Sequence, residues 1–386
     1  MVNGWKTKKL GEVAEVCMCK RIFAHQTSKI GNIPFYKIGT FGKEADAYIS
    51  SQLYEEYKSK YSYPEKGDVL ISAAGTLGRT VVFDGRPAYF QDSNIVWLKI
   101  DKSQLSNDYL AQYYKVIKWA SSEGSTISRL YNGIICDTEI LLPPLEEQVA
   151  IAEALSDIDS LISSLQKLIE KKKAIKQGAM QELLTSKKRL PGFSGKRKRK
   201  KLGNYIKFEV GFPFKSRYFN SQHIGLRLIK NRDLKSDDQV YYTTEDVSSE
   251  YIVNNGDVLV GMDGDFTPCI WRKGVALLNQ RVGRIGAFGM DLLFSYYLLQ
   301  QPLQELQIGT GATTVKHLSH FDVEELELTF PEEIKEQQAI AQVLSDMDND
   351  IEQLEKKLAK YQQIKQGMMQ ELLTGRIRLK EGENNA

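Results

Sequence analysis

The stretch IKQGAMQELLT at Ile175–Thr185 recurs almost letter for letter as IKQGMMQELLT at Ile364–Thr374. Both copies belong to a longer repeat, because residues 147–190 align with residues 336–379 without a gap and give 25 identities in 44 positions. Chance does not produce such a match over this length, so the chain is a tandem duplication. We expect two equivalent halves, each with a mixed first part and a charged helical second part.

Weaker echoes of the repeat extend into the first part of each half. GDVLIS at Gly67 resembles GDVLVG at Gly256, and Gln91 aligns with Gln280. Short apolar runs such as DVLIS, NIVWLKI, DVLVG and RVGRI lie between Gly, Asp and Asn turns and predict strands, whereas residues 105–120 and 290–306 have helical periodicity. Each first part is therefore predicted to be a mixed α/β domain.

The second part of each half has apolar residues in alternating steps of four and three, which is typical of a narrow coiled-coil seam. Forty helical residues rise roughly 60 Å, more than the width of a small domain. We expect the two helices to pair antiparallel as a rod with a globular domain at either end; the alternative is that each helix folds back onto its own domain. The predicted seam residues are Ile151, Leu155, Ile158, Ile162, Leu165, Ile340, Leu344, Met347, Ile351 and Leu354.

The predicted fold class is α+β, a pseudo-twofold tandem repeat of two mixed α/β domains and two long helices that form an antiparallel coiled coil. Prolines before the helices and Pro or Gly after them give the boundaries, and the run GKRKRKKLG predicts an exposed basic linker. The predicted segments are domain 1 at 1–143, helix 1 at 144–190, the linker at 191–201, domain 2 at 202–330, helix 2 at 331–379 and a disordered tail at 380–386.

Gly178 and Gly367 occupy equivalent positions in the middle of the two predicted helices. A glycine there costs roughly 1 kcal/mol relative to alanine. Its retention in both copies has three explanations: close approach of the helices, docking of another subunit, or a tolerated defect of the duplication.

Composition excludes several protein classes. The chain has 386 residues, 42% hydrophobic, with a net charge of only +3, and it contains no apolar run long enough to span a membrane. A cytoplasmic protein is expected. Cys17, Cys19, Cys136 and Cys269 are too few and too scattered for a disulfide framework, so reduced thiols are expected, with Cys17 and Cys19 as small core residues.

Motifs for catalysis are missing. The sequence has no GxxxxGK[ST] phosphate loop, no HExxH and no GxSxG, and His25, His223, His317 and His320 are too dispersed for a metal site. We therefore predict no catalytic and no metal-ligating residue. A stand-alone enzyme that cleaves or modifies DNA would need such a motif, and a structural scaffold would need only the coiled coil.

Polar loops between the predicted strands are rich in side chains that can reach base edges and phosphates of double-stranded DNA. The predicted DNA-binding residues are loop donors or acceptors that flank strands. They are Lys37, Thr40, Arg79, Gln91, Ser93, Asn94, Arg129, Tyr131 and Asn132 in the first half, and Lys230, Asn231, Arg232, Asn279, Gln280, Arg281, Lys316 and His317 in the second.

The motifs LPPLEEQVAIAEALSDID with MQELLTSKKRL, and their second copies, resemble the specificity subunit of type I restriction-modification systems. The resemblance covers nearly the whole chain. It implies two target recognition domains that each read one half of a bipartite asymmetric DNA target, and helices that set the spacing and dock two methyltransferase subunits. It also implies restriction/translocase subunits in the full adenine-methyltransferase and endonuclease complex.

The resemblance places the cofactors elsewhere: S-adenosylmethionine, ATP and Mg on the partner subunits, and none in this chain. The alternative interpretation is a stand-alone DNA-binding or scaffold protein without a methyltransferase partner.

Overall fold

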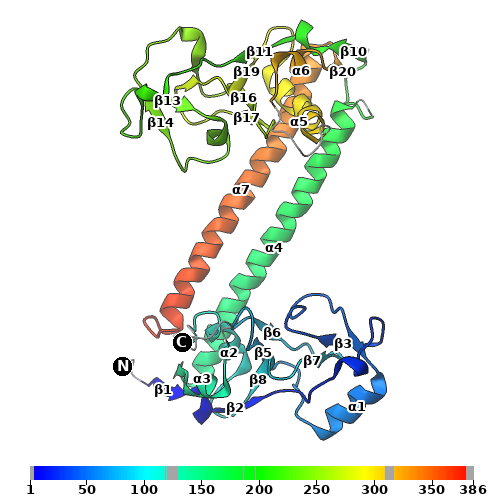
Figure 1. The fold of residues 1–386 in the computed structure, drawn as a ribbon, viewed down its shortest axis with the longest axis vertical. Coiled ribbons are helices and arrows are strands. Elements are labelled where there is room, and N and C mark those ends of the chain that lie inside the picture. Colours follow the sequence, from blue (N-terminus) through cyan, green and yellow to red (C-terminus); the bar gives the residue numbers. More distant parts are fainter. Residues whose placement is uncertain are drawn as a thin grey trace, which may run out of the picture. The chain divides into compact units, whose positions relative to one another are not determined.

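The computed structural model describes residues 4–117, 119, 129–185, 187–195, 197–308 and 317–379. The chain divides into two compact units, Met1–Gln166 with Lys356–Ala386, and Lys167–Glu355. Each unit holds one globular domain, the beginning of the long helix that follows that domain and the end of the other long helix (Figure 1).

The first domain contains three small sheets. One is the antiparallel pair β1-β9, the second is antiparallel with the order β2-β8-β5-β6, and the third has the order β4-β3-β7, with β3 and β7 parallel. The elements are β1 Lys6–Lys9, β2 Ala14–Cys17, β3 Ile33–Tyr36, β4 Tyr48–Ile49, α1 Ser51–Lys60, β5 Val69–Ser72, β6 Thr80–Val82, β7 Tyr89–Phe90, β8 Ile95–Ile100, α2 Asn107–Tyr113, α3 Asn132–Asp137, β9 Glu139–Leu142 and α4 Leu145–Leu184.

The second domain repeats this layout. Its sheets are β10-β20, β11-β19-β16-β17 and β12-β14-β13-β18-β15, with β13 and β18 parallel. The elements are β10 Arg197–Lys201, β11 Ile206–Val210, β12 Phe219–Asn220, β13 Leu226–Ile229, β14 Tyr241–Thr243, β15 Ile252–Val253, β16 Val258–Gly261, β17 Pro268–Ile270, β18 Ala276–Leu278, β19 Val282–Ala287, α5 Leu292–Ile308, α6 His320–Glu324, β20 Glu327–Pro331 and α7 Ile334–Leu372.

The predicted fold class is confirmed, and the central strands form where the apolar runs predicted them. β5 and β16 are buried along their whole length, which explains why their sequences are continuous apolar runs without alternation. The four cysteines are free, and Cys17 and Cys19 are buried in the core of the first domain, as expected.

The first turns of each long helix belong to the core of their own domain. Ile151 and Leu155 are fully buried among domain 1 residues, and Ile340 and Leu344 are fully buried among domain 2 residues. These turns anchor each helix to its own domain, but the alternative that the whole helix folds back onto that domain is wrong, because the last turns of each helix pack in the core of the other unit. Farther along, the seam residues Ile158, Leu165 and Ile351 are also buried, and Ile162, Met347 and Leu354 are partly buried.

The last turns of each helix complete the opposite core. Leu372 at the end of α7 and the following Leu373 pack with the first domain, and Met180 and Leu183 from α4 pack with the second. Each unit therefore contains an antiparallel helix pair, since the start of one helix lies beside the end of the other. The apolar side chains of each MQELL segment are therefore buried in the core of the other half of the chain.

A repeated glutamine fixes each helix to its domain. The Gln148 side chain accepts a hydrogen bond from the Ser106 backbone N–H at 2.9 Å and donates to the Gln104 and Pro143 carbonyls at 2.8 and 2.9 Å. Gln337 accepts from the Asp291 N–H at 2.8 Å in the same way. A buried amide with its bonds satisfied specifies one arrangement, which explains why both copies retain it.

A repeated Asp–Lys pair joins the two helices in each unit. Lys176 donates to the Asp348 carboxylate at 2.5 Å, and Lys365 pairs with Asp159. These residues are the last Asp of the SDxD motif and the Lys of the IKQG motif. Two motifs that lie far apart in each copy therefore meet across the helix pair.

The predicted basic linker is wrong, because Arg197–Lys201 forms β10 and pairs antiparallel with β20. β10 and its exposed lysines are the counterpart of β1 in the first domain. The helices are also shorter than the predicted 144–190 and 331–379, since they lie at Leu145–Leu184 and Ile334–Leu372. The predicted tail at 380–386 lies outside the described residues.

Gly178 and Gly367 do not mark a close helix contact. A Cβ added at either glycine would meet nothing within 4 Å beyond the backbone of its own helix. Close approach of the helices is therefore excluded as the reason for their retention, and docking of another subunit or a tolerated defect remain.

Candidate nucleic-acid interface

The turn that follows β3 collects four of the predicted residues of the first domain. The Thr40 hydroxyl accepts a hydrogen bond from the Lys37 backbone N–H at 3.1 Å and closes the turn. The Gln91 side chain accepts from the Ile38 N–H at 3.0 Å, and Arg79 donates to the Ile38 carbonyl at 2.9 Å. These two side chains hold the turn, while the Lys37 ammonium pairs with Asp46 at the surface at 2.8 Å.

Arg79 is engaged inside the protein. Its guanidinium carbon lies 5.6 Å from the centroid of the Phe41 ring, and its Nε is buried without a hydrogen-bond partner among the described residues. This side chain supports the loop instead of projecting from it.

A second group of predicted residues lies next to this turn. Ala74 and Arg129 form an isolated antiparallel bridge, which places the Arg129 side chain beside the loop before β8. Arg129 donates to the Ser93 carbonyl at 3.1 Å and lies 3.5 Å from the Asn94 side-chain oxygen. Ser93 has a positive φ of 52°, so this loop turns sharply and turns its carbonyl toward the arginine.

Tyr131 and Asn132 form a separate pair at the start of α3. Both are exposed, and the Tyr131 side chain is 56% accessible. Tyr131 lines a shallow hollow of about 820 Å³ together with Tyr113 and Val116. This pair follows Arg129 closely in the sequence but does not take part in the hydrogen bonds between Arg129, Ser93 and Asn94.

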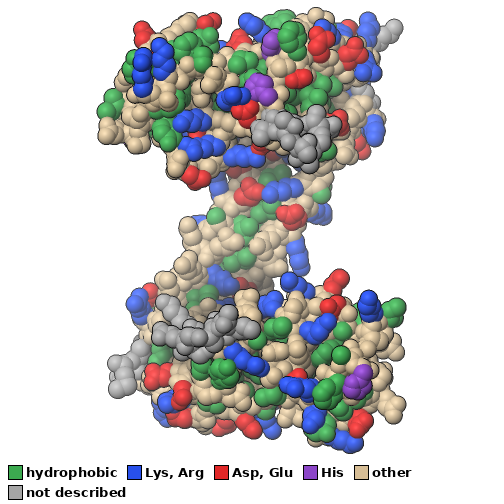
Figure 2. Space-filling model, viewed as in Figure 1, with side chains coloured by type: hydrophobic (Ala, Val, Ile, Leu, Met, Phe, Trp, Pro, Cys, Tyr) green, Lys and Arg blue, Asp and Glu red, His purple; other side chains and the backbone are tan. Residues whose placement is uncertain are grey.

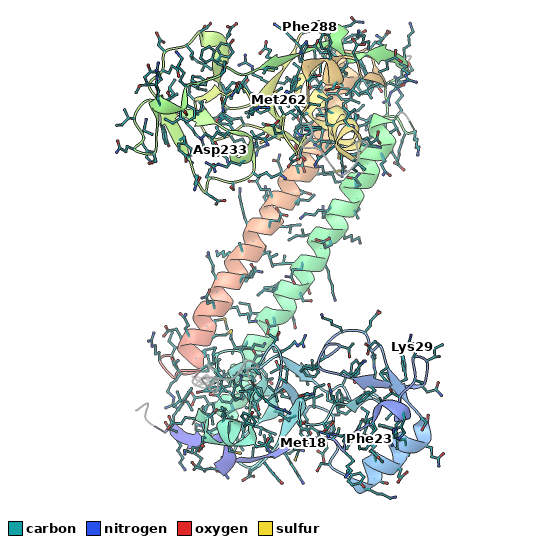
Figure 3. All side chains as sticks on the ribbon, in the orientation of Figure 1. Met18, Phe23, Lys29, Asp233, Met262 and Phe288 are labelled. Atoms are coloured by element: carbon teal, nitrogen blue, oxygen red, sulfur yellow. The ribbon has the colours of Figure 1, made fainter. Side chains whose placement is uncertain are left out.

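The turn after β13 in the second domain is built like the turn after β3. The Asp233 carboxylate accepts a hydrogen bond from the Lys230 N–H at 2.8 Å and closes the turn. Asp233, labelled in Figure 3, is buried, and burial raises the pKa of its carboxyl. The Lys230 ammonium lies 3.4 Å from the centroid of the Tyr241 ring, and burial lowers its pKa. Arg232 is exposed beside the same ring at 5.6 Å.

Asp263 contacts three of the predicted residues of the second domain. Its carboxylate oxygen lies 3.3 Å from an Arg281 guanidinium nitrogen and 3.0 Å from the His317 Nδ1, and these two side chains are themselves 3.3 Å apart. The Asn231 amide donates to the Asp263 carbonyl at 2.6 Å. Four loops of domain 2 therefore meet at one place.

Two further predicted residues of the second domain lie beside this place. The Asn279 side chain accepts from the backbone N–H of Gln280 at 3.0 Å, and Gln280 is exposed immediately before Arg281. Lys316 lies outside the described residues. Sequence reasoning missed Asp263, although its position in the Gly-rich turn MDGD directly after a buried strand was a usable signal.

The registers of the sheets show which positions of the two domains correspond. The alignment of Gln91 with Gln280 in the sequence is wrong, because parallel pairing with β3 and β13 makes Asn279 the counterpart of Gln91. The loop before β8 is one residue longer than the loop before β19. The other equivalent positions are Lys37 with Lys230, Ala74 with Asp263, Asn94 with Arg281, and Arg129 with His317.

The face of the molecule shown in Figure 2 has no single basic patch. On the surface shown in Figure 2, basic and acidic side chains are interspersed over both domains. This distribution agrees with the small net charge of +3. Contacts to a polyanion would therefore depend on individual loop residues more than on a broad electrostatic field.

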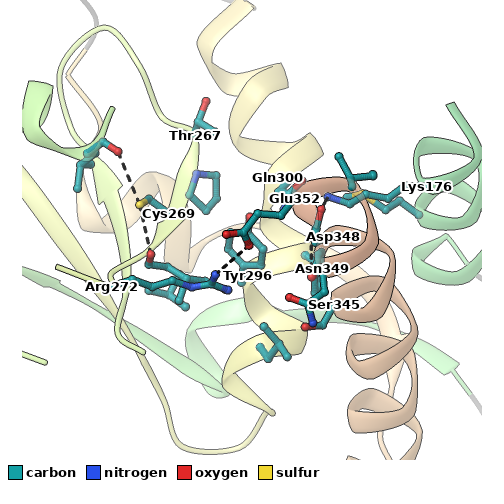
Figure 4. Close-up of a pocket in the computed structure, with 18 of the residues that line it drawn as sticks. Lys176, Thr267, Cys269, Arg272, Tyr296, Gln300, Ser345, Asp348, Asn349 and Glu352 are labelled. Atoms are coloured by element: carbon teal, nitrogen blue, oxygen red, sulfur yellow. Dashed lines mark hydrogen bonds and ion pairs between the residues drawn. The ribbon is translucent and has the colours of Figure 1, made fainter. Parts of the chain in front are cut away.

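The second unit also contains a groove of about 1200 Å³ between α5, β17 and the helix pair (Figure 4). Its charged groups neutralise each other: Lys176 contacts Asp348, and Arg272 lies 3.6 Å from Glu352. The Tyr297 hydroxyl donates to Asp348 at 2.8 Å. We assign no DNA contact to this groove.

The described ranges contain neither a metal-binding cluster nor a membrane-spanning helix. No group of three or more His, Cys, Asp or Glu residues there could hold a metal ion. Within the same part of the chain, no helix is both long and apolar enough to cross a membrane.

Comparison with known proteins gives consistent results. The family described as type I restriction modification DNA specificity domain matches twice, at residues 3–177 and 192–366. A putative type I restriction enzyme specificity subunit of Haemophilus influenzae is 56% identical over 160 residues, which is 42% of each chain. The match thus spans less than half of that relative. The putative MjaX specificity subunit of Methanocaldococcus jannaschii is 25% identical over 97% of this chain and 94% of its own.

Solved structures show the same fold. The S subunit of a type I restriction-modification system from M. genitalium is 15% identical and superposes with a TM-score of 0.63 over 96% of each chain. A chain from a structure of a type I restriction-modification complex is 14% identical, with a TM-score of 0.53 over 97% of this chain and 99% of its own.

Proposed function

Because this chain belongs to the type I restriction-modification DNA specificity family, we propose that it is the DNA sequence-specificity subunit of such a complex. In this proposal each globular domain reads one half of a bipartite target. The observation that carries the proposal is that each domain brings its own set of corresponding loops together, and that the side chains on these loops differ between the two domains. Two readers with the same fold and different loop chemistry would recognise two different half-sites.

The chemistry of the loops suits this role. Arg, Asn, Gln and His side chains hydrogen-bond to base edges in the grooves, whereas the charged Lys37 and Arg232, at 40% and 47% side-chain accessibility, suit contacts to phosphate. Such contacts add a salt-dependent, sequence-independent part to the affinity. S-adenosylmethionine, ATP and Mg are expected on the partner subunits.

The two long helices are proposed to set the spacing of the half-sites and to dock two methyltransferase subunits. Both α4 and α7 run without interruption from one compact unit into the other. The duplication provides each unit with one copy of the paired SDxD and IKQG motifs, so a single kind of partner could bind twice. In the full complex, restriction/translocase subunits would join this assembly.

Selection from a random duplex pool tests the proposal. The purified chain, with its methyltransferase partners, should enrich a bipartite asymmetric sequence with an unread gap, and methylation should require both partners and S-adenosylmethionine. The chain alone should transfer no methyl group. Enrichment of no sequence would support a scaffold instead, and methyl transfer by the isolated chain would contradict a non-catalytic role.

A further inference from the structure

Two facing side chains occupy the same place in each domain. In the first domain they are Asn94 and Arg129, with 3.5 Å between the amide oxygen and the guanidinium. In the second they are Arg281 and His317, at 3.3 Å. The bridges Ala74–Arg129 and Asp263–His317 show that the pairs are equivalent, since each bridge lies two residues beyond a corresponding strand position.

The turns that neighbour these pairs have the same hydrogen-bonded frame in both domains. The neighbouring turns are closed alike, by Thr40 in one domain and Asp233 in the other, and both begin with a lysine. The two turns therefore share a hydrogen-bonded frame, although Asn231 and Arg232 stand in the second domain where the first has Ile38 and Gly39. The facing pairs keep one arginine each but place it at different positions, since Asn94 corresponds to Arg281 and Arg129 corresponds to His317.

We propose that the facing pairs Asn94–Arg129 and Arg281–His317 are the specificity-determining pairs of the two half-sites, with Asp263 as a positioning residue for the second. This inference rests on the proposed function. The Arg281 and His317 side chains are 52% and 49% accessible, so both can reach a ligand while Asp263 holds one edge of each. In the first domain the Ser93 carbonyl has the corresponding role for Arg129.

The side-chain types give the expected bases. Arginine donates two parallel hydrogen bonds to the O6 and N7 of guanine, and asparagine pairs with N6 and N7 of adenine. Each half-site should therefore contain a guanine read by its arginine, Arg129 in the first and Arg281 in the second. The base beside the first guanine should be read by Asn94.

Lysine substitutions provide the sharpest test, because lysine keeps the charge but loses the planar fork. We would prepare Arg129→Lys, Arg281→Lys and the matched control Arg86→Lys, an exposed arginine of the first domain with 87% accessibility. Each full-length variant, in complex with the methyltransferase subunits, would select from a random duplex pool. Thermal melting verifies folding, and Asn94→Ser tests the first pair from its other side.

The expected result is local to one half-site. Arg129→Lys should reduce discrimination about 5- to 150-fold at one base pair of the first half-site and leave the second unchanged, and Arg281→Lys should do the reverse. Arg86→Lys should change neither. The triple substitution Ala74→Asp, Asn94→Arg and Arg129→His should give the first half-site the base preference of the second.

Two results would overturn the inference. One is that both lysine variants keep the parent profile at every position. The other is uniform weakening of all sequences, which identifies a phosphate contact. In either case the parent still selects a bipartite target, so the proposed function stands. If the parent chain enriches no sequence, the proposed function itself is wrong.

Discussion

Glu147, in the first turn of α4, accepts two hydrogen bonds from Arg378, which follows α7 and lies 231 positions later in the chain. The distances are 3.1 Å from Nε and 2.7 Å from Nη2, and Trp5 donates to the same carboxylate at 3.1 Å. The equivalent Glu336 accepts from Arg189 and Arg197. In each unit, the Glu of the EQ motif and the Arg of the RL motif therefore join the start of one long helix to the segment that follows the other.

The first prediction concerns this carboxylate. Glu336 is fully buried and Arg197 almost so, at 1% and 7% side-chain accessibility, hence Glu336→Gln should lower the free energy of unfolding by about 3–5 kcal/mol. Glu147→Gln should cost less, about 1–3 kcal/mol, because the Glu147 carboxylate is buried but its partner Arg378 is 41% accessible and partly solvated. Urea titration measures both. Glu146→Gln, an exposed neighbour, is the control, and equal losses in all three variants would contradict the buried clamp.

The second prediction concerns pH. Burial by itself would raise the pKa of the Glu336 carboxyl, but the hydrogen bonds from Arg189 and Arg197 outweigh it and hold this pKa below the ordinary value of 4.5. An acid with a depressed pKa contributes stability above its unfolded pKa and loses that contribution as the pH falls through its folded pKa.

The difference in stability between wild type and Glu336→Gln should therefore be constant near neutral pH and shrink below about pH 4.5. Urea titrations at several pH values measure this difference. A difference that grows on acidification would show that the carboxylate is not stabilised by its arginines.

The third prediction concerns Lys37. Its ammonium is 40% accessible and pairs with Asp46 at the surface, so it can exchange this partner for a phosphate. Lys37→Gln should weaken binding of all duplexes alike and reduce the slope of log affinity against log salt by about one. Lys60→Gln, on the exposed face of α1, is the control and should leave the slope unchanged. A base-specific loss in Lys37→Gln would mean that this lysine reads sequence.

The fourth prediction concerns Gly178 and Gly367. Since an added Cβ meets open space at both positions, each change to alanine should stabilise its helix by about 1 kcal/mol. Chemical denaturation measures this gain, and destabilisation would show a contact that the geometry lacks.

Binding of methyltransferase subunits to the same variants separates the two remaining explanations. Weaker binding indicates that the glycines leave room for a docking partner. Unchanged binding indicates a tolerated defect of the duplication.

The fifth prediction tests the exchange of helix ends between the halves. A fragment of residues 1–195 ends before β10 and contains both Glu147 and Arg189, so two copies should form the clamp reciprocally and select a palindrome of the first half-site. The pairs Lys172–Asp350 and Lys173–Glu355 would be lost, because Leu161 and Gln166 occupy the equivalent acidic positions.

The dimer should therefore form but dissociate more readily than the two halves of the parent chain. Light scattering measures its mass, and sequencing of bound duplexes gives its target. A monomer, or a dimer that still selects the asymmetric parent target, would show that the halves are not interchangeable.

Much of the fold was predictable because the signals are local. The step of four and three that runs from Ile151 to Leu165 specifies a helix by itself, and the buried run at Val258 specifies a central strand by itself. The prediction of a linker was wrong because its structure depends on a long-range contact. The run at Arg197 is charged, and only its pairing with β20 makes it a strand.

The sequence alone determined the duplication, the two α/β domains, the long helices and the membership of the family, since each is written in repeats and periodicities that neighbouring residues carry. Only the tertiary structure decided which loop residues meet. Arg79 is held inside by Ile38, whereas Arg281 is held at the surface by Asp263. Both are loop arginines in the sequence. Their difference depends on strands paired across many residues, and therefore on long-range contacts that no local pattern encodes.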